Sequence, residues 1–97
     1  MPVKTDESPL EDSDVLVEED LGYGLVVWND DVNTFDWVIL TLVEVCGHTH
    51  EQAEQCSLFI HFNGKYTVKQ DSFEVLKPMC EAILDRGISA TLEEVPV

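Results

Sequence analysis

Apolar and polar residues alternate along this 97-residue chain in patterns that predict six secondary-structure elements. Residues 23–28 (YGLVVW) form a β-branched and aromatic run, which is typical of a buried strand. The apolar residues that follow are spaced i, i+3, i+4, i+7, i+8 and i+11, which is one face of a helix: Phe35, Val38, Ile39, Leu42, Val43 and Cys46. Asn33 or Thr34 can cap the start of this helix, and Gly47 can adopt the left-handed conformation that ends it.

A second helix follows almost at once. Residues 49–52 (Thr-His-Glu-Gln) fit a capping box, in which the Thr hydroxyl and the Gln amide each satisfy a free backbone N–H group. The apolar positions of this helix continue to Ile60, and Asn63-Gly64 is a stop signal. Residues 65–68 then predict a short strand.

The third helix is capped by Asp71 or Ser72 and closed by Gly87. Pro78 lies inside its apolar pattern, where a proline removes a backbone N–H and crowds a preceding carbonyl. We therefore expect a kink there, or a helix that begins near Lys77. Residues 89–94 alternate and predict the last strand.

The resulting order is β-α-α-β-α-β. It predicts an α+β fold in a single domain, with a three-stranded antiparallel sheet packed against three helices. A chain of 97 residues is too short to enclose a second core.

Charge narrows the choice of partners. With 5 Lys+Arg against 20 Asp+Glu, the formal net charge is −15, so we expect neither nucleic acid nor an anionic membrane as a partner. No apolar run approaches the roughly 20 residues that span a bilayer. The first residues lack the apolar core of a signal peptide, and we expect a cytoplasmic location.

The acidity is concentrated at the start of the chain. Residues 1–20 carry eight acids and one base, for a net charge of −7, and few apolar residues. Such a segment cannot bury enough surface to offset its ordering entropy. We therefore predict a flexible acidic extension at residues 1–22 and a folded core at residues 23–97. Composition leaves open whether this arm is a solvated tail or a tether that engages a partner.

Metal binding and catalysis have weak support. Three cysteines (Cys46, Cys56 and Cys80) are an odd number, which favours free thiols over a disulfide framework. His48 and His50 lie near two of them, but the paired spacings of zinc sites are absent. The chain also lacks a nucleophile elbow, a glycine-rich phosphate loop and a His-Glu-x-x-His motif. We expect no metal, no cofactor and no enzymatic activity.

A binding site is better supported. Residues 29–31 (Asn-Asp-Asp) supply an amide oxygen and two carboxylates, all of which accept hydrogen bonds from a cation. His61 follows apolar positions at the end of the second helix, so its ring can lie at the rim of an apolar pocket. This set suits a ligand with an ammonium group and a hydrophobic side group. Alternatively, the loop is only a capping turn and His61 is structural.

The same residues resemble the ClpS adaptor family, which brings N-end-rule substrates to the Clp AAA+ protease. The likeness runs from about residue 25 to residue 94 in the family's order. It is carried by residues 27–31 (VWNDD), 35–38 (FDWV), 54–65 (EQCSLFIHFNGK) and 90–93 (ATLE).

The resemblance implies roles for particular residues. Asn29 and His61 would hydrogen-bond the free α-amino group of a substrate, with Asp31 as the favoured carboxylate and Asp30 as its neighbour. The pocket for the first side chain would be lined by Val27, Asn33, Phe35, Val38, Ser57, Ile60 and Leu92. The implied ligand is a polypeptide that begins with Leu, Phe, Tyr or Trp. Lys77 matches a lysine through which the family docks on the N-terminal domain of the Clp unfoldase, and the arm would help to hand over the substrate.

Two pocket positions depart from the family. Phe35 stands where a Met is usual at the pocket mouth, which narrows the pocket, and Ser57 replaces a second Met, which opens it. We therefore hypothesise a non-enzymatic, monomeric adaptor for N-degrons. The alternative is a protein–protein docking module without a pocket for an N-terminal residue, and it would be favoured if Phe35 filled the space beneath His61.

Overall fold

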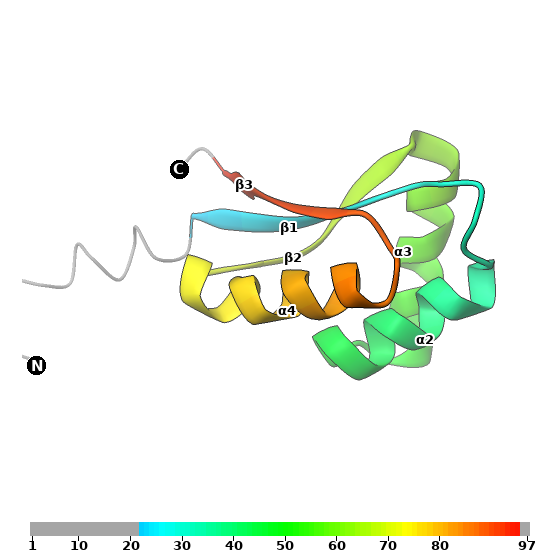
Figure 1. Ribbon diagram of the computed structural model, residues 1–97, viewed down its shortest axis with the longest axis horizontal. Helices are drawn as coiled ribbons and strands as arrows, with labels where there is room; N and C mark the ends of the chain where they lie inside the picture. The colour runs from blue at the N-terminus through cyan, green and yellow to red at the C-terminus, as the bar shows by residue number, and fades with distance from the viewer. Residues whose placement is uncertain (1–21, 96–97) are drawn as a thin grey trace, which may run out of the picture.

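The sheet is built around a central strand, β1 (Tyr23–Trp28), in the computed structural model, which describes residues 22–95. β1 pairs antiparallel with β2 (Lys65–Asp71) on one side and with β3 (Ala90–Glu94) on the other, so the strand order is β2-β1-β3 (Figure 1). Because both hydrogen-bonding edges of β1 are occupied, the end of this strand is held in a fixed position.

Each helix begins at a Ser or Thr whose hydroxyl accepts a hydrogen bond from a backbone N–H in the first turn. These caps are Thr34, Thr49 and Ser72, and Thr49 forms a full capping box with Gln52. Gly47 and Gly64 follow two of the helices at φ of 74° and 87°, a conformation that glycine adopts without strain. The helices are α2 (Phe35–Cys46), α3 (His50–Asn63) and α4 (Phe73–Asp85).

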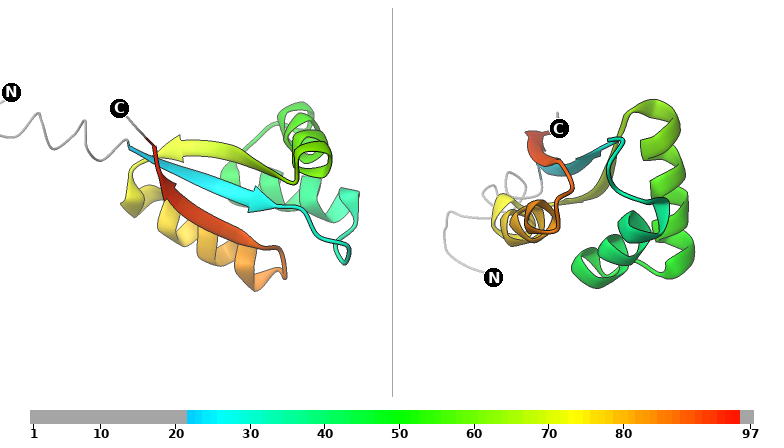
Figure 2. Two further views of the ribbon diagram at one scale, coloured as in Figure 1. Left: turned by 90° about the horizontal axis from the view of Figure 1, so that it is seen from above. Right: turned by 45° about the vertical axis from the view of Figure 1, so that its right-hand side comes forward.

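The helices cover one face of the sheet and leave the other open. α4 runs beneath the strands, and α2 and α3 pack against each other beside it, whereas no described helix lies over the strands when they are viewed from above (Figure 2). Alternation along β1 follows this arrangement, since Leu25 and Val27 are fully buried in the core and Val26 faces the open side. The largest fully buried core side chains also include Leu42, Leu76, Ile83 and Ile88.

A β-bulge interrupts the pairing of β1 with β2. Leu25 pairs with Lys69 and Val26 pairs with Thr67, so Val68 has no partner on β1. The Nε2 atom of His48 donates a hydrogen bond to the Val68 carbonyl at 2.9 Å. His48 therefore satisfies a backbone group at the bulge, and this explains one of the two linker histidines without a metal.

The predicted α+β fold and its element order are confirmed. Two strand boundaries differ from the prediction: β2 extends to Asp71, and β3 begins at Ala90. α4 begins at Phe73 with Ser72 as its cap, which is one of the two predicted caps. The helix runs through Pro78, so a start near Lys77 is wrong. Ser72 and the burial of Leu76 fix the first turn ahead of the proline. The predicted arm at residues 1–22 lies outside the described residues except for its last position.

Candidate functional site

The loop between β1 and α2 is organised by the carboxylate of Asp30. Its Oδ1 atom accepts hydrogen bonds from the backbone N–H groups of Val32, at 2.8 Å, and Asn33, at 2.7 Å. Its Oδ2 atom accepts a third bond, at 2.8 Å, from the Asn33 side-chain amide. The backbone and side-chain bonds from Asn33 hold the pKa of Asp30 below its ordinary value of 3.8, although partial burial opposes them. Asp30 is therefore a carboxylate at neutral pH.

Backbone hydrogen bonds fix the loop to two other turns. The Asn29 N–H donates to the Gly64 carbonyl at 2.9 Å, and the Trp28 N–H donates to the Ser89 carbonyl at 3.0 Å. The Asn33 side chain donates a further bond, at 2.8 Å, to the carbonyl of Gly87, 54 residues away. The loop is thus held between the turn that follows α3 and the turn that follows α4.

The first turn of α2 supplies two apolar walls. Thr34 caps the helix by accepting a hydrogen bond from the Trp37 N–H at 3.1 Å. Because the helix has started by this point, Phe35 and Val38, which are three residues apart, lie on one face of it. The Trp37 indole donates a hydrogen bond to the carbonyl of Arg86 at 3.0 Å. This bond ties the start of α2 to the end of α4, so the walls are anchored from outside the pocket.

The last turns of α3 supply the opposite wall. Ser57, Ile60 and His61 follow the i, i+3, i+4 spacing of one helix face. Ser57 and Ile60 are buried, whereas His61 is exposed at the end of the helix, and its ring meets that of Phe62 edge to face at 5.1 Å. Along this face, the polar and accessible side chain is that of His61, and the side chain of Ser57, one turn earlier in the helix, is buried.

These three segments enclose a pocket of about 250 Å³. The volume is below the roughly 300–1,000 Å³ of sites for drug-sized molecules, so it suits one side chain rather than a longer ligand. Acceptor groups lie on the loop and at the end of α3, with apolar side chains between them. The lining residues are Asn29, Asp30, Asn33, Phe35, Val38, Ser57, Ile60 and His61.

The structure brings together most of the residues singled out in the sequence, with three exceptions. Asp31 is exposed and does not line the pocket, so the carboxylate beside the pocket is that of Asp30. Val27 is buried within the core on β1, and Leu92 packs against that core from β3. The Gly64 and Gly87 carbonyls, which hold the loop in place, were not foreseen, because a backbone acceptor leaves no signal in a residue pattern.

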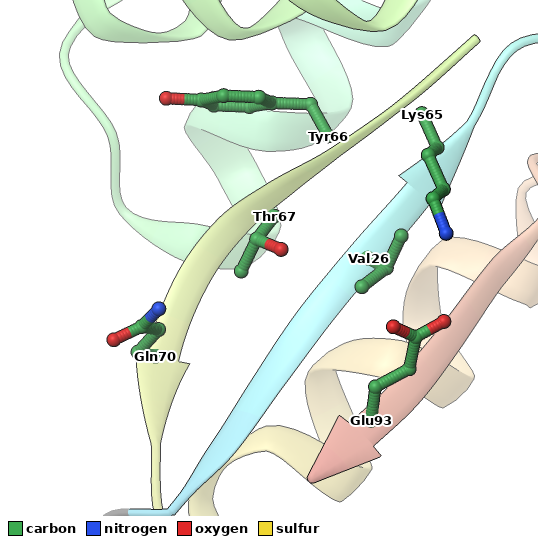
Figure 3. A pocket seen from close by; sticks show the side chains of 6 residues that line it. All are labelled: Val26, Lys65, Tyr66, Thr67, Gln70 and Glu93. Atoms are coloured by element: carbon green, nitrogen blue, oxygen red, sulfur yellow. The ribbon is translucent and has the colours of Figure 1, made fainter. Parts of the chain in front are cut away.

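A second hollow lies on the open face of the sheet (Figure 3). Lys65 and Glu93 flank Val26 from the strands on either side. The Tyr66 ring points away toward α3, where it stacks on the ring of Phe59 with 4.8 Å between the ring centroids. This hollow of about 390 Å³ is lined by Val26, Lys65, Tyr66, Thr67, Gln70 and Glu93. It offers opposite charges on an open surface, and it lacks the set of acceptors beside apolar walls that distinguishes the first pocket.

Among residues 22–95, no group of three or more His, Cys, Asp or Glu side chains is placed to hold a metal ion. The three cysteines are free, and burial raises the pKa of the Cys46 thiol to about 11. No helix in this part of the chain is long and apolar enough to cross a membrane.

Comparison with known proteins now decides the family. The family model described as ClpS, ATP-dependent Clp protease adaptor protein, matches residues 18–92. This chain belongs to the ClpS family. The family consists of adaptors of the Clp protease, so the chain is an adaptor and not an enzyme.

Individual ClpS proteins are similar to this chain in sequence or in structure. The ClpS adapter of Nitratidesulfovibrio vulgaris (strain DP4) is 39% identical over 72 residues, which cover 70% of this chain and 69% of that protein. The ClpS adapter of Corynebacterium aurimucosum is 25% identical over 81 residues, or 84% of this chain and 73% of that protein. The solved structure of Agrobacterium tumefaciens ClpS2 bound to L-phenylalaninamide superposes with a TM-score of 0.71 at 18% identity, covering 77% of this chain and 98% of that one. This last likeness shows the ClpS fold.

Proposed function

We propose that this ClpS-family adaptor binds polypeptides through a free N-terminal amine and a bulky hydrophobic first residue, and that it delivers them to the AAA+ unfoldase of the Clp protease. The observation that carries the proposal is the 250 Å³ pocket, because one small space joins hydrogen-bond acceptors to apolar walls. L-Phenylalaninamide, the compound bound to Agrobacterium tumefaciens ClpS2, has the same combination of a free amine and an apolar side chain.

The acceptors match an α-ammonium group in number and in charge. An ammonium offers three N–H donors, and an N-terminal amine has an ordinary pKa of about 7.7–8.0, so it is mostly protonated at pH 7. Asn29 offers its amide oxygen, Asp30 a carboxylate oxygen, and His61 a ring nitrogen that accepts a hydrogen bond in the neutral form of the ring. Since Asp30 is anionic, it contributes a charge-assisted bond, which is stronger than a neutral one.

The side-chain part of the pocket favours a bulky apolar group. Phe35, Val38 and Ile60 line it from two helices. Phe35 is 39% exposed and forms a wall, and space remains beneath His61. This arrangement favours an N-terminal-residue pocket over a docking module without one.

Delivery requires a second surface, and we propose that it includes Lys77 on α4. Its ammonium group pairs with the Glu81 carboxylate at 2.7 Å, and both side chains are more than half exposed. The assignment of Lys77 rests on the match to the docking lysine of ClpS proteins. The partner would be the N-terminal domain of the unfoldase, and the adaptor would act as a monomer.

The proposal is tested by fluorescence anisotropy with labelled peptides that begin with Leu or Phe, each in free and N-acetylated form. We expect the free peptides to bind and acetylation to weaken binding about 10- to 100-fold, because each acceptor that the bound peptide covers without giving it a donor costs about 1–3 kcal/mol. Asp30→Asn should weaken binding of the free peptides about 10-fold, whereas Asp31→Asn, the matched control, should change it less than about 2-fold. Equal affinity for free and acetylated peptides would refute amine recognition.

A further inference from the structure

One residue inside the pocket differs in chemistry from the apolar walls around it. Ser57 lines the pocket from α3 and is only 2% exposed. Its Oγ atom is buried and has no hydrogen-bond partner within residues 22–95. The wall of the pocket therefore holds one unsatisfied polar atom beneath its surface, on a residue that lines the pocket together with Val38 and Ile60.

An unsatisfied buried hydroxyl is unusual. Most buried polar side-chain atoms in folded proteins have a partner, because an unpaired one loses its hydration without compensation. A serine within a helix can bond the carbonyl four residues earlier, which here belongs to Ala53, but Ser57 does not make this bond. Since the described part of the protein provides no partner, a rotation about the Cα–Cβ bond of Ser57 that turns the hydroxyl toward a group entering the pocket breaks no hydrogen bond.

The position of Ser57 relative to His61 shows which group that is. The two residues are four apart on α3, so they share a helix face and are separated by about 6 Å along the axis. His61 is exposed, whereas Ser57 is buried, so Ser57 lies at the inner end of this face. A ligand whose amine is held at His61 can therefore extend its first side chain along this face toward Ser57.

We propose that the pocket selects Tyr over Phe as the first residue of its substrates, through a hydrogen bond between the phenol hydroxyl and Ser57 Oγ. This inference rests on the proposed function, and it names the substrate class more narrowly. A phenol and a serine hydroxyl each donate and accept, so either direction of the bond satisfies both groups. Phe differs from Tyr by this hydroxyl alone and leaves Ser57 unpaired.

The experiment compares two peptides that are identical except for Tyr or Phe at the first position, each with a free and an acetylated amine. We expect native protein to bind the free Tyr peptide about 3- to 10-fold more tightly than the free Phe peptide, which is the range for one net hydrogen bond. Ser57→Ala should bring the two affinities to within about 2-fold, through weaker binding of the Tyr peptide. The control is Thr41→Val, which removes another buried, unpartnered hydroxyl, on α2 and outside the pocket lining, and it should leave the preference intact.

The outcomes separate the two proposals. If free and acetylated peptides bind equally or neither binds, amine recognition fails, and with it the basis of the preference. If binding requires the free amine but native protein does not prefer Tyr, only the role of Ser57 is refuted. The same conclusion follows if Ser57→Ala retains the preference. The comparison within native protein needs no variant, so a poorly folding variant would not leave the inference untested.

Discussion

The Asn33 side chain should brace the loop that carries Asn29 and Asp30 against the turn after α4. Asn33 donates one amide hydrogen bond to Asp30 Oδ2 and one to the carbonyl of Gly87, both at 2.8 Å. Replacing it with Ala removes both bonds and leaves the backbone bond from residue 33 to Asp30 in place. The change therefore isolates the link between the loop and the turn after α4.

The expected loss of unfolding free energy follows from the two acceptors that Asn33 would leave. A hydrogen bond to a charged group contributes about 1.5–3 kcal/mol and one to a neutral carbonyl about 0.5–1.5 kcal/mol. The bond to Gly87 is exposed and the bond to Asp30 is half-buried, so water compensates for part of the loss and the lower ends of these ranges apply. We expect Asn33→Ala to lower the free energy of unfolding by about 2 kcal/mol.

Urea denaturation followed by tryptophan fluorescence measures this change. Asn33→Asp should cost more than Asn33→Ala at pH 7, because it presents carboxylate oxygens to two acceptors. Asp31→Ala is the matched control, since Asp31 is exposed on the same loop and should change stability by less than about 0.5 kcal/mol.

The pKa of Asp30 provides a second readout. The Asn33 side chain helps to lower this pKa below 3.8, so Asn33→Ala should raise it. A lowered folded-state pKa stabilises the protein above the unfolded value, and this stability is lost as the pH falls through the folded value. The variant should consequently lose less stability than native protein on acidification. Unchanged stability together with an unchanged Asp30 pKa would refute the bracing role of Asn33.

Two further predictions concern the core and α4. Pro78→Ala restores a donor for the Glu74 carbonyl, so it should raise the free energy of unfolding by about 1–3 kcal/mol; an equal or lower urea midpoint would contradict this reasoning. Burial raises the pKa of Cys46 from 9.0 to about 11, so the stability from its neutral thiol is complete below pH 9 and is lost as the pH rises through 11, by up to about 2–3 kcal/mol. Cys46→Ala should lack this share of the alkaline loss, and a pH dependence identical to that of native protein would refute it.

Local patterns were sufficient to predict the elements. The hydrophobic spacing of α2, the capping box of Thr49 and Gln52, and the glycine after each of these two helices act within a few residues. α4 was harder, because the sequence contains conflicting signals, a good cap at Ser72 and a proline at position 78. The burial of Leu76 in the core favours the longer helix, and such a tertiary contact is absent from any local pattern.

In the candidate site too, local sequence patterns predict some residues, whereas other features depend on contacts that only the fold provides. Its lining residues were predictable because they belong to a short loop and two helix faces with clear spacing. The choice between Asp30 and Asp31 was not, because both are acids on one turn, and only the observed bonds to Val32 and Asn33 turn Asp30 inward. The bond from Asn33 to Gly87 joins residues 54 apart and has no counterpart in the sequence pattern.

The hydrogen bonds of Asp30 explain how the loop can serve structure and binding together. A carboxylate has about four acceptor positions, and the loop occupies three of them, two on Oδ1 and one on Oδ2. One position on Oδ2 remains for an incoming donor. The backbone of Asn29 is likewise fixed by Gly64 before any ligand arrives. Because folding has already ordered the Asp30 carboxylate and the Asn29 backbone, the proposed binding of an N-terminal amine would not have to order them again, and the small pocket could hold its ligand with few contacts.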